Sequence, residues 1–169
     1  RMTAPDPLVP RELRIPIRER MRENGEVEIP LDEASIKEAV DLLRSSGVDA
    51  VAICFLHSWR NPSHEQAAAD AVRAALPHLF VTTSSEVLPQ IKEFERFSTA
   101  VVNAYVGPPV SGYLDRLARR LTEAGFEGPL FVILSHGGVA PIAEAARLAV
   151  GTALSGPAGG VAAAVAIAK

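Results

Sequence analysis

The sequence has one cysteine among its 169 residues, so a disulfide within the chain is excluded. Cys54 lies inside an apolar run, and we therefore expect a buried, unreactive thiol. Such cysteine usage fits a reducing compartment, and we expect a cytoplasmic location. The N-terminus has no charged start followed by an apolar core and a cleavage site, so a secretory signal is not expected.

Long runs of one charge are also missing, and the net charge is only −3. This balance argues against nucleic acid or an anionic membrane surface as a partner. The longest apolar helical run ends the chain and is too short to span a bilayer. No Gly-x-x-x-x-Gly-Lys-Ser/Thr pattern occurs, which excludes a Walker-type loop. The 48% hydrophobic content can nevertheless fill the core of one large or two small domains.

An α/β unit is predicted over residues 31–90. Its helix, strand, helix and strand fall at residues 31–46, 48–56, 61–76 and 79–83. Asp32 is the expected N-cap of the first helix, and Gly47 the residue that ends it. Residues 84–90 are expected to form a loop.

Two further segments flank this unit. Residues 1–30 are rich in proline and predict an extended connector, with a hairpin that returns over residues 26–29. Residues 91–125 predict a helical segment. Gly107-Pro108-Pro109 should break or kink it, because proline removes a backbone donor and its ring clashes with the preceding turn.

The last segment, residues 126–169, predicts a βαβ unit followed by a helix. Leu130–Leu134 is a continuous apolar run, typical of a strand buried on both faces. A short helix over residues 141–148 and a strand over 150–154 would complete a parallel pair. Residues 161–168 contain no side chain larger than Ile, which suits a helix built for close packing.

A polar cluster on the segment 91–125 is the first candidate site. Glu95, Thr99 and Asn103 share one helical face by their spacing, and Arg96 lies on a neighbouring stripe with Asn103. Three aligned polar groups beside an aromatic face could line a cleft. The alternative is a solvated surface with local ion pairs.

Two histidine pairs are weak candidates for a metal site. His57-Ser58 and His64-Glu65 lie close in sequence, but they lack the His-x-x-x-His spacing of a helical zinc site. We favour a structural role for them and expect no metal.

Two glycine-rich segments are the remaining candidates. Ser135-His136-Gly137-Gly138 could present backbone N–H groups to an anion, or form an ordinary tight turn. His136 could act as a general acid or base. Ser155–Gly160 is either an anion site at a helix N-terminus or, through Gly156, Gly159 and Gly160, a place where two helices cross closely; we favour the second interpretation.

These glycine segments also carry a resemblance. The chain resembles the hydantoinase A/5-oxoprolinase family in the motif Ser-His-Gly-Gly-Val, followed after about a dozen residues by Ser-Gly-Pro-Ala-Gly-Gly-Val. The resemblance extends to shorter segments such as Asn61-Pro62, Glu93–Arg96 and Asn103-Ala104-Tyr105. His136 stands where Asn is usual in that family, which favours a hydrogen-bonding role for it. Ala149 stands where Pro is usual.

The resemblance implies an α/β, actin-like ATPase (ribonuclease H-like) lobe with parallel strands and packed helices. It implies ATP and Mg2+ as cofactors, a cyclic-amide substrate and a hydantoinase B-type partner. Phosphoryl transfer to the amide oxygen would then prepare the carbon for attack by water.

The alternatives are a subunit of an ATP-dependent ketone carboxylase and a non-catalytic assembly scaffold. The candidate catalytic residues are Glu95, Arg96 and His136. Neither Asp-x-Gly-Gly-Thr turn of that superfamily occurs here, so we expect an internal fragment, inactive by itself, with Ser155–Gly160 in the helix that connects two lobes.

Overall fold

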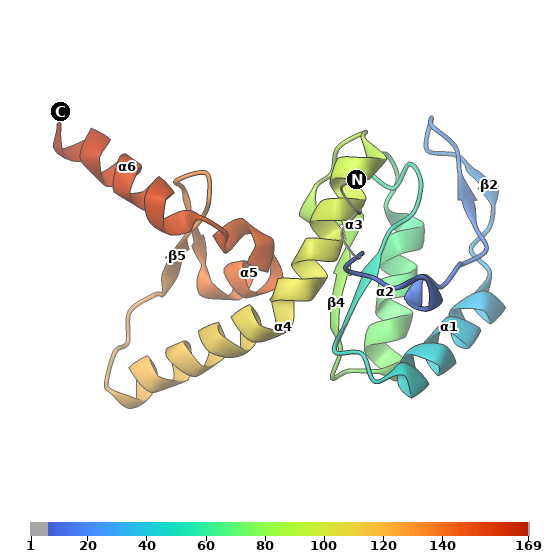
Figure 1. The fold of residues 1–169 in the computed structure, drawn as a ribbon, viewed down its shortest axis with the longest axis horizontal. Helices are drawn as coiled ribbons and strands as arrows, with labels where there is room; N and C mark the ends of the chain where they lie inside the picture. Colours follow the sequence, from blue (N-terminus) through green and yellow to red (C-terminus); the bar gives the residue numbers. More distant parts are fainter. Residues whose placement is uncertain (1–6, 169) are drawn as a thin grey trace, which may run out of the picture. The chain divides into compact units, whose positions relative to one another are not determined.

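The computed structural model describes residues 7–168, so the first six residues of the predicted connector and Lys169 lie outside it. The described chain forms two compact units, unit 1 up to Tyr105 and unit 2 from Val106 (Figure 1). No helix within residues 7–168 combines the length and the apolar composition that crossing a membrane requires.

Unit 1 contains a short antiparallel hairpin and a parallel strand pair. A 3-10 helix, η1 (Arg11–Leu13), precedes the hairpin of β1 (Arg20–Met21) and β2 (Val27–Ile29), which confirms the predicted return over residues 26–29. β3 (Ala50–Ile53) and β4 (Phe80–Thr83) pair in parallel, with Ala50 opposite Phe80. The carboxyl ends of β3 and β4 therefore lie at the same edge.

Helix α1 (Glu33–Ser46) begins and ends where the sequence predicts. The Asp32 side chain accepts a hydrogen bond from the Ser35 N–H, and so satisfies one of the helix's free donors. Gly47 follows with φ of 67°, a left-handed conformation that glycine adopts at little cost. α2 (Ser63–Ala75) and the single turn α3 (Ser84–Val87) complete the helices that lie wholly in unit 1, and α3 replaces part of the expected loop.

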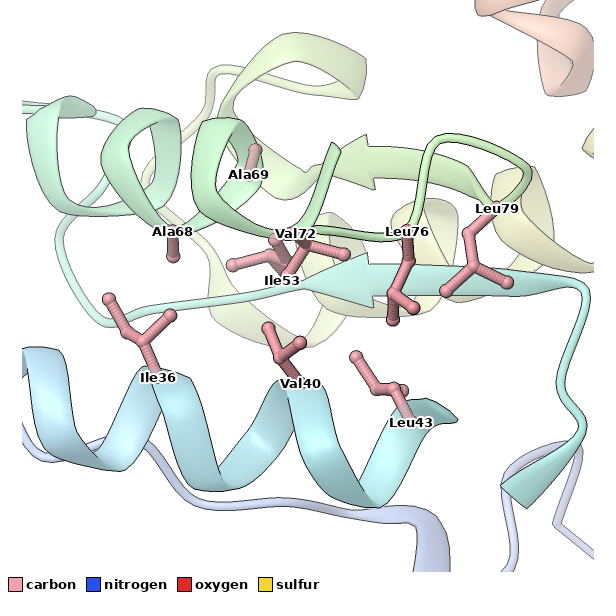
Figure 2. Packing of buried hydrophobic residues seen from close by; sticks show 9 residues of the cluster. All are labelled: Ile36, Val40, Leu43, Ile53, Ala68, Ala69, Val72, Leu76 and Leu79. Atoms are coloured by element: carbon pink, nitrogen blue, oxygen red, sulfur yellow. The ribbon is translucent and has the colours of Figure 1, made fainter. Parts of the chain in front are cut away.

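The core of unit 1 lies between α1, α2 and the strand pair. Ile36, Val40 and Leu43 of α1 point toward α2 and toward Ile53 of β3 (Figure 2). The remaining members of this core cluster are Ala68, Ala69, Val72, Leu76 and Leu79. The 3.6-residue spacing in α1 thus produces the buried stripe that the sequence predicts.

Helix α4 (Glu93–Glu123) runs from unit 1 into unit 2. The predicted break at Gly107-Pro108-Pro109 is wrong, and the kink given as its alternative stays a prediction. The backbone remains helical through Pro108 and Pro109. Proline's fixed φ is compatible with a helix, so its cost is a lost hydrogen bond and a steric clash of about 3 kcal/mol rather than a forced end.

Unit 2 continues with β5 (Phe131–Ile133), β6 (Val139–Pro141), α5 (Ile142–Arg147), the 3-10 helix η2 (Ala149–Thr152) and α6 (Ser155–Ile167).

The predicted βαβ unit is wrong. β5 and β6 form an antiparallel hairpin, because Gly137 turns the chain with φ of 83° and returns it at once. The expected strand over residues 150–154 is η2, whose Gly151 N–H bonds to the Leu148 carbonyl.

The prediction of a strand over Leu130–Leu134 that is buried on both faces is wrong about its burial. β5 exists, but Phe131 is 58% and Ile133 43% exposed. Both residues share one face of the hairpin with Val139 and Pro141, while Ala140 is buried on the other face. A two-stranded hairpin has only one covered face here, so half of its apolar side chains stay on the surface.

Candidate functional site

A buried polar network joins the carboxyl ends of β3 and β4. Glu65 of α2 and Arg96 of α4 lie at its centre, and neither side chain is exposed. Ser84, at the end of β4, connects them: its hydroxyl donates to Glu65 Oε1 at 2.6 Å and accepts from Arg96 Nε at 3.1 Å. A carboxylate and a guanidinium are thereby held in the interior through a shared hydroxyl.

Both charged groups also bind the backbone of Phe55, just beyond β3. The Phe55 N–H donates to Glu65 Oε1 at 2.8 Å, and its carbonyl accepts from an Arg96 terminal nitrogen at 2.9 Å. The other Glu65 oxygen accepts from the Ser85 N–H. Because buried charges destabilise a fold unless they are paired and hydrogen-bonded, this network fixes the two strand ends firmly.

The network extends to further polar groups at the same edge. The Ser58 hydroxyl lies 3.3 Å from that of Ser84 and donates to the Phe55 carbonyl at 3.1 Å. Asn103, which is fully buried on α4, donates to Thr82 Oγ1 at 3.0 Å. The Arg96 guanidinium also bonds to the Gln90 carbonyl and lies over the Phe97 ring.

The structure separates the predicted polar face of residues 91–125. Asn103 is buried in the network, whereas Glu95 is exposed and Thr99 lies between, bonded to the Glu95 carbonyl. Glu95, Thr99 and Asn103 therefore line no common cleft. Arg96 is enclosed and supports the strand ends, so a catalytic role for Glu95 or Arg96 stays a prediction.

From the sequence, Glu65 is considered only as half of a possible metal pair with His64, and Ser84 is not identified. A signal for Glu65 exists in the spacing: it shares the stripe of Ala68, Ala69 and Val72 at i+3, i+4 and i+7, all of them buried. A lone carboxylate on an apolar stripe indicates a buried acid with dedicated partners. Ser84 offers no comparable signal, because a serine after a strand usually starts a loop.

The two histidine pairs are each divided: Ser58 and Glu65 belong to the network, whereas His57 and His64 make other contacts. His64 Nδ1 is 2.8 Å from Glu19 Oε2, so this pair ties the N-terminal segment to α2. His57 adopts a left-handed conformation with φ of 57°, and its carbonyl accepts from the N–H groups of Arg60 and Asn61 in a tight turn. Among the described residues no group of three or more His, Cys, Asp or Glu side chains could hold a metal ion.

Burial acts on Cys54, which precedes Phe55. Removal from water raises the pKa of the thiol to about 12, with the Glu65 carboxylate adding to the rise and Arg96 opposing it. Cys54 is partly rather than fully buried, and it lines a surface cavity, so the predicted full burial is wrong. The raised pKa supports the predicted low reactivity of the thiol.

In the glycine turn of unit 2, residues 135–138, backbone N–H groups donate to acceptors within the chain. The Ser135 N–H bonds to the Gly151 carbonyl, the Gly137 N–H to the Leu134 carbonyl and the Gly138 N–H to His136 Nδ1. These three groups are thus not directed at a ligand. Because Nδ1 accepts, a neutral His136 carries its proton on Nε2, where the exposed ring can donate to solvent or solute.

The second glycine segment forms the first turns of α6 rather than a loop before it. A Cβ at Gly159 would come 2.9 Å from Ile133 Cδ1, and one at Gly137 would come 3.7 Å from the Ala158 carbonyl oxygen. α6 thus packs closely on the hairpin through backbone. At Gly156 and Gly160 a Cβ would meet nothing within 4 Å among the described atoms.

An anion site at the start of α6 gains little from this geometry. Pro157 has no N–H, and the Ala158 N–H bonds to the Leu154 carbonyl at 3.5 Å. Close packing on Ile133 explains why residue 159 is glycine, but it gives no reason for glycine at position 160. The nucleotide-binding or hinge role of Ser155–Gly160 stays a prediction.

Comparison with known proteins decides the family. The family described as Hydantoinase/oxoprolinase N-terminal region matches residues 2–76, and the one described as Hydantoinase/oxoprolinase matches residues 96–169. The chain belongs to the hydantoinase/oxoprolinase family. The resemblance inferred from the glycine segments is therefore confirmed.

Individual relatives agree with this membership. The chain is 48% identical over 151 residues to caprolactamase subunit alpha of Pseudomonas jessenii, which covers 89% of this chain and 22% of that protein. It is 35% identical over 130 residues to 5-oxoprolinase of Saccharomyces cerevisiae, covering 77% of this chain and 10% of that one. The chain thus spans about a fifth or less of the length of these relatives.

Solved structures of family members share the fold. The ATP-dependent caprolactamase of P. jessenii matches with a TM-score of 0.74 at 48% identity, over 84% of this chain and 21% of that chain. A nucleotide-free acetone carboxylase matches with a TM-score of 0.82 at 30% identity, over 94% of this chain and 23% of that one. The predicted α/β fold with parallel strands and packed helices is confirmed.

Proposed function

We propose that this chain is part of an ATP-dependent hydrolase of cyclic amides. The observation that carries the proposal is the 48% identity to caprolactamase subunit alpha over 89% of the chain. The similarity to 5-oxoprolinase, whose name also denotes a cyclic amide, supports the same reaction class. ATP and Mg2+ as cofactors belong to this proposal, as does a partner of the hydantoinase B type, since the caprolactamase relative is named as a subunit.

The described residues do not fit an ATP site by themselves. The N–H groups of the glycine turn bond within the chain, α6 has Pro157 in its first turn, and residues 7–168 offer no carboxylate cluster for a metal ion. We therefore assign this chain no step in handling phosphate. Its proposed contribution is structural support, in which the Glu65–Ser84–Arg96 network holds two strand ends where ligands bind in open α/β sheets.

A ketone carboxylase is the second candidate. The acetone carboxylase structure covers 94% of the chain with the higher TM-score of 0.82. Its sequence identity of 30% is well below the 48% to caprolactamase, which favours the amide hydrolase.

Substrate assays on the purified full-length protein, with its partner subunit, would separate these functions. ATP would be supplied with caprolactam, hydantoin or 5-oxoproline in one series, and with acetone and bicarbonate in another. We expect a ring-opened amino acid together with loss of ATP in the first series. Carboxylation of acetone with every cyclic amide left intact would refute the hydrolase, and no ATP-dependent turnover in either series would favour the scaffold.

A further inference from the structure

We propose that unit 1 contains a binding site for a small, free organic monocarboxylate with an apolar body. The site is a cavity of about 300 Å³ between the N-terminal segment and the chain that leaves β3. Ile15, Ile17 and Arg20 of the N-terminal segment are among the lining residues. Cys54, Phe55 and Leu56 after β3 and Phe97 of α4 line it as well. A volume at the low end for ligand sites suits a small molecule.

The position of the cavity supports a ligand role. Phe55 and Leu56 follow β3 directly, at the carboxyl edge of the parallel pair, where open α/β sheets bind ligands. The Phe55 backbone is held on both sides, by Glu65 at 2.8 Å and by Arg96 at 2.9 Å. This wall is therefore preorganised, and binding there requires little ordering of the chain.

The opposite wall is also anchored. Glu19, which lines the cavity beside Arg20, holds His64 of α2 at 2.8 Å, and both of these side chains are largely buried. The N-terminal segment is thereby fixed across the cavity from Phe55. Because Glu19 is occupied by His64, it does not serve as the partner of Arg20.

Arg20 supplies the charge that selects the ligand. Within residues 7–168 its exposed side chain has no carboxylate or other acceptor as a partner. A free guanidinium fork matches the two oxygens of a carboxylate. A single arginine beside the carboxylate of Glu19 suits a monoanion better than a phosphate dianion, because the dianion would be repelled more strongly.

The other lining groups define the body of the ligand. Ile15, Ile17, Leu56 and Phe97 contribute hydrocarbon side chains to the lining, beside the polar groups of Glu19, Arg20 and Cys54. Each methylene that such walls cover strengthens binding by about fourfold at most. A chain of about six carbons is a suitable probe for a cavity of this size.

Calorimetric titration of the full-length protein tests the site. Hexanoate should bind, while hexanamide, which has the same shape without the charge, should bind about tenfold more weakly or worse. Inorganic phosphate should also be about tenfold weaker. Dodecanoate should gain much less than fourfold per added methylene, because a volume of about 300 Å³ cannot cover its outer carbons. No binding of hexanoate at any soluble concentration would overturn the proposal, as would equal binding of hexanamide or phosphate.

A matched pair of variants places the binding in the cavity. Arg20→Gln should weaken hexanoate about tenfold, and its exposed position should leave the fold intact. Arg22→Gln is the control, since Arg22 lies on the same segment outside the cavity and pairs with Glu28 at 3.5 Å. It should change affinity by less than about twofold. Hexanoate affinity unchanged in Arg20→Gln, or lowered equally in both variants, would show that the cavity is not the site.

Discussion

Unit 1 and unit 2 bury different kinds of side chain. In the described chain every buried charged or polar residue belongs to unit 1, together with the core cluster of α1, α2 and β3. The buried apolar residues of unit 2 are mostly alanines. They are Leu114, Ala140, Ala145 and Ala149.

The apolar side chains of unit 2 lie largely on its surface. Phe131, Val139 and Ile167 are 58%, 63% and 86% exposed, and α6 has no buried residue at all. A helix that is apolar on every side is ordinarily buried. Unit 1 fills its own core, whereas unit 2 of this chain buries few apolar side chains, so we expect the local stability of unit 2 to be lower.

Removing Arg96 should have the largest effect. Arg96→Leu leaves the Glu65 carboxylate buried without a neighbouring cation. It also removes a donor from the Gln90 carbonyl and one of the two donors of the Phe55 carbonyl. We expect the free energy of unfolding of unit 1 to fall by about 3–5 kcal/mol. Denaturant unfolding, monitored through the hydrogen exchange of residues 50–58, would measure this loss of stability. A loss below about 1 kcal/mol would mean that the network does not support the strand ends.

Removing the shared hydroxyl should have an intermediate effect. Ser84→Ala deletes the donor to Glu65 and the acceptor of Arg96, so we expect a loss of about 1–3 kcal/mol. Ser85→Ala is the matched control. It keeps the backbone N–H that bonds to Glu65, and should change stability by no more than about 0.5 kcal/mol. Equal losses in both variants, in the same unfolding experiment, would argue against a special role for Ser84.

Two neighbouring glycines of α6 provide a smaller contrast within unit 2. Gly160→Ala adds a methyl group in open space and should stabilise the helix by about 0.5–1 kcal/mol. Gly159→Ala brings a methyl to 2.9 Å from Ile133 Cδ1, and overpacking of about 1–3 kcal/mol should offset or exceed the gain in helix stability. Hydrogen exchange of residues 155–167 would report both changes. The same shift in both variants would show that α6 does not pack on β5 as described.

Cys54 has no expected effect on the pH dependence of stability near neutral pH, and its effect appears only in alkaline solution. Its pKa of about 12 in the folded chain exceeds the ordinary value of 9.0, so the folded state holds the proton more tightly. The resulting stability is present in full below pH 9 and is lost as the pH rises toward 12. At pH 9 iodoacetamide should label Cys54 at least about tenfold more slowly in the folded than in the urea-unfolded chain, because the thiolate is the reactive form. Equal rates would contradict the raised pKa.

Much of unit 1 follows from local sequence, because its signals are local. Asp32 and Gly47 define α1 by cap chemistry, and the apolar spacing between them gives its buried face. The network could not be predicted as a whole, since Phe55, Glu65, Ser84 and Arg96 meet only after β3 and β4 pair.

Unit 2 shows where local signals mislead. The apolar run at residues 150–154 resembles a strand, but within residues 7–168 it pairs with no strand. Short-range hydrogen bonds instead place residues 149–152 in the 3-10 helix η2. The glycines of residues 135–138 have the composition of an anion turn, yet their N–H groups bond to Gly151, Leu134 and His136. Composition alone cannot tell which acceptor a donor will find.

Hydrogen exchange along the 169-residue chain tests the contrast between the two units most directly. The account predicts that backbone amides of β3 and β4 exchange slowly, near the rate set by unfolding of unit 1. Amides of β5, β6 and α6 should exchange at least about a hundredfold faster, through local opening of a unit with little buried apolar area. Equal protection of residues 131–141 and 155–167 with residues 50–53 and 80–83 would contradict it.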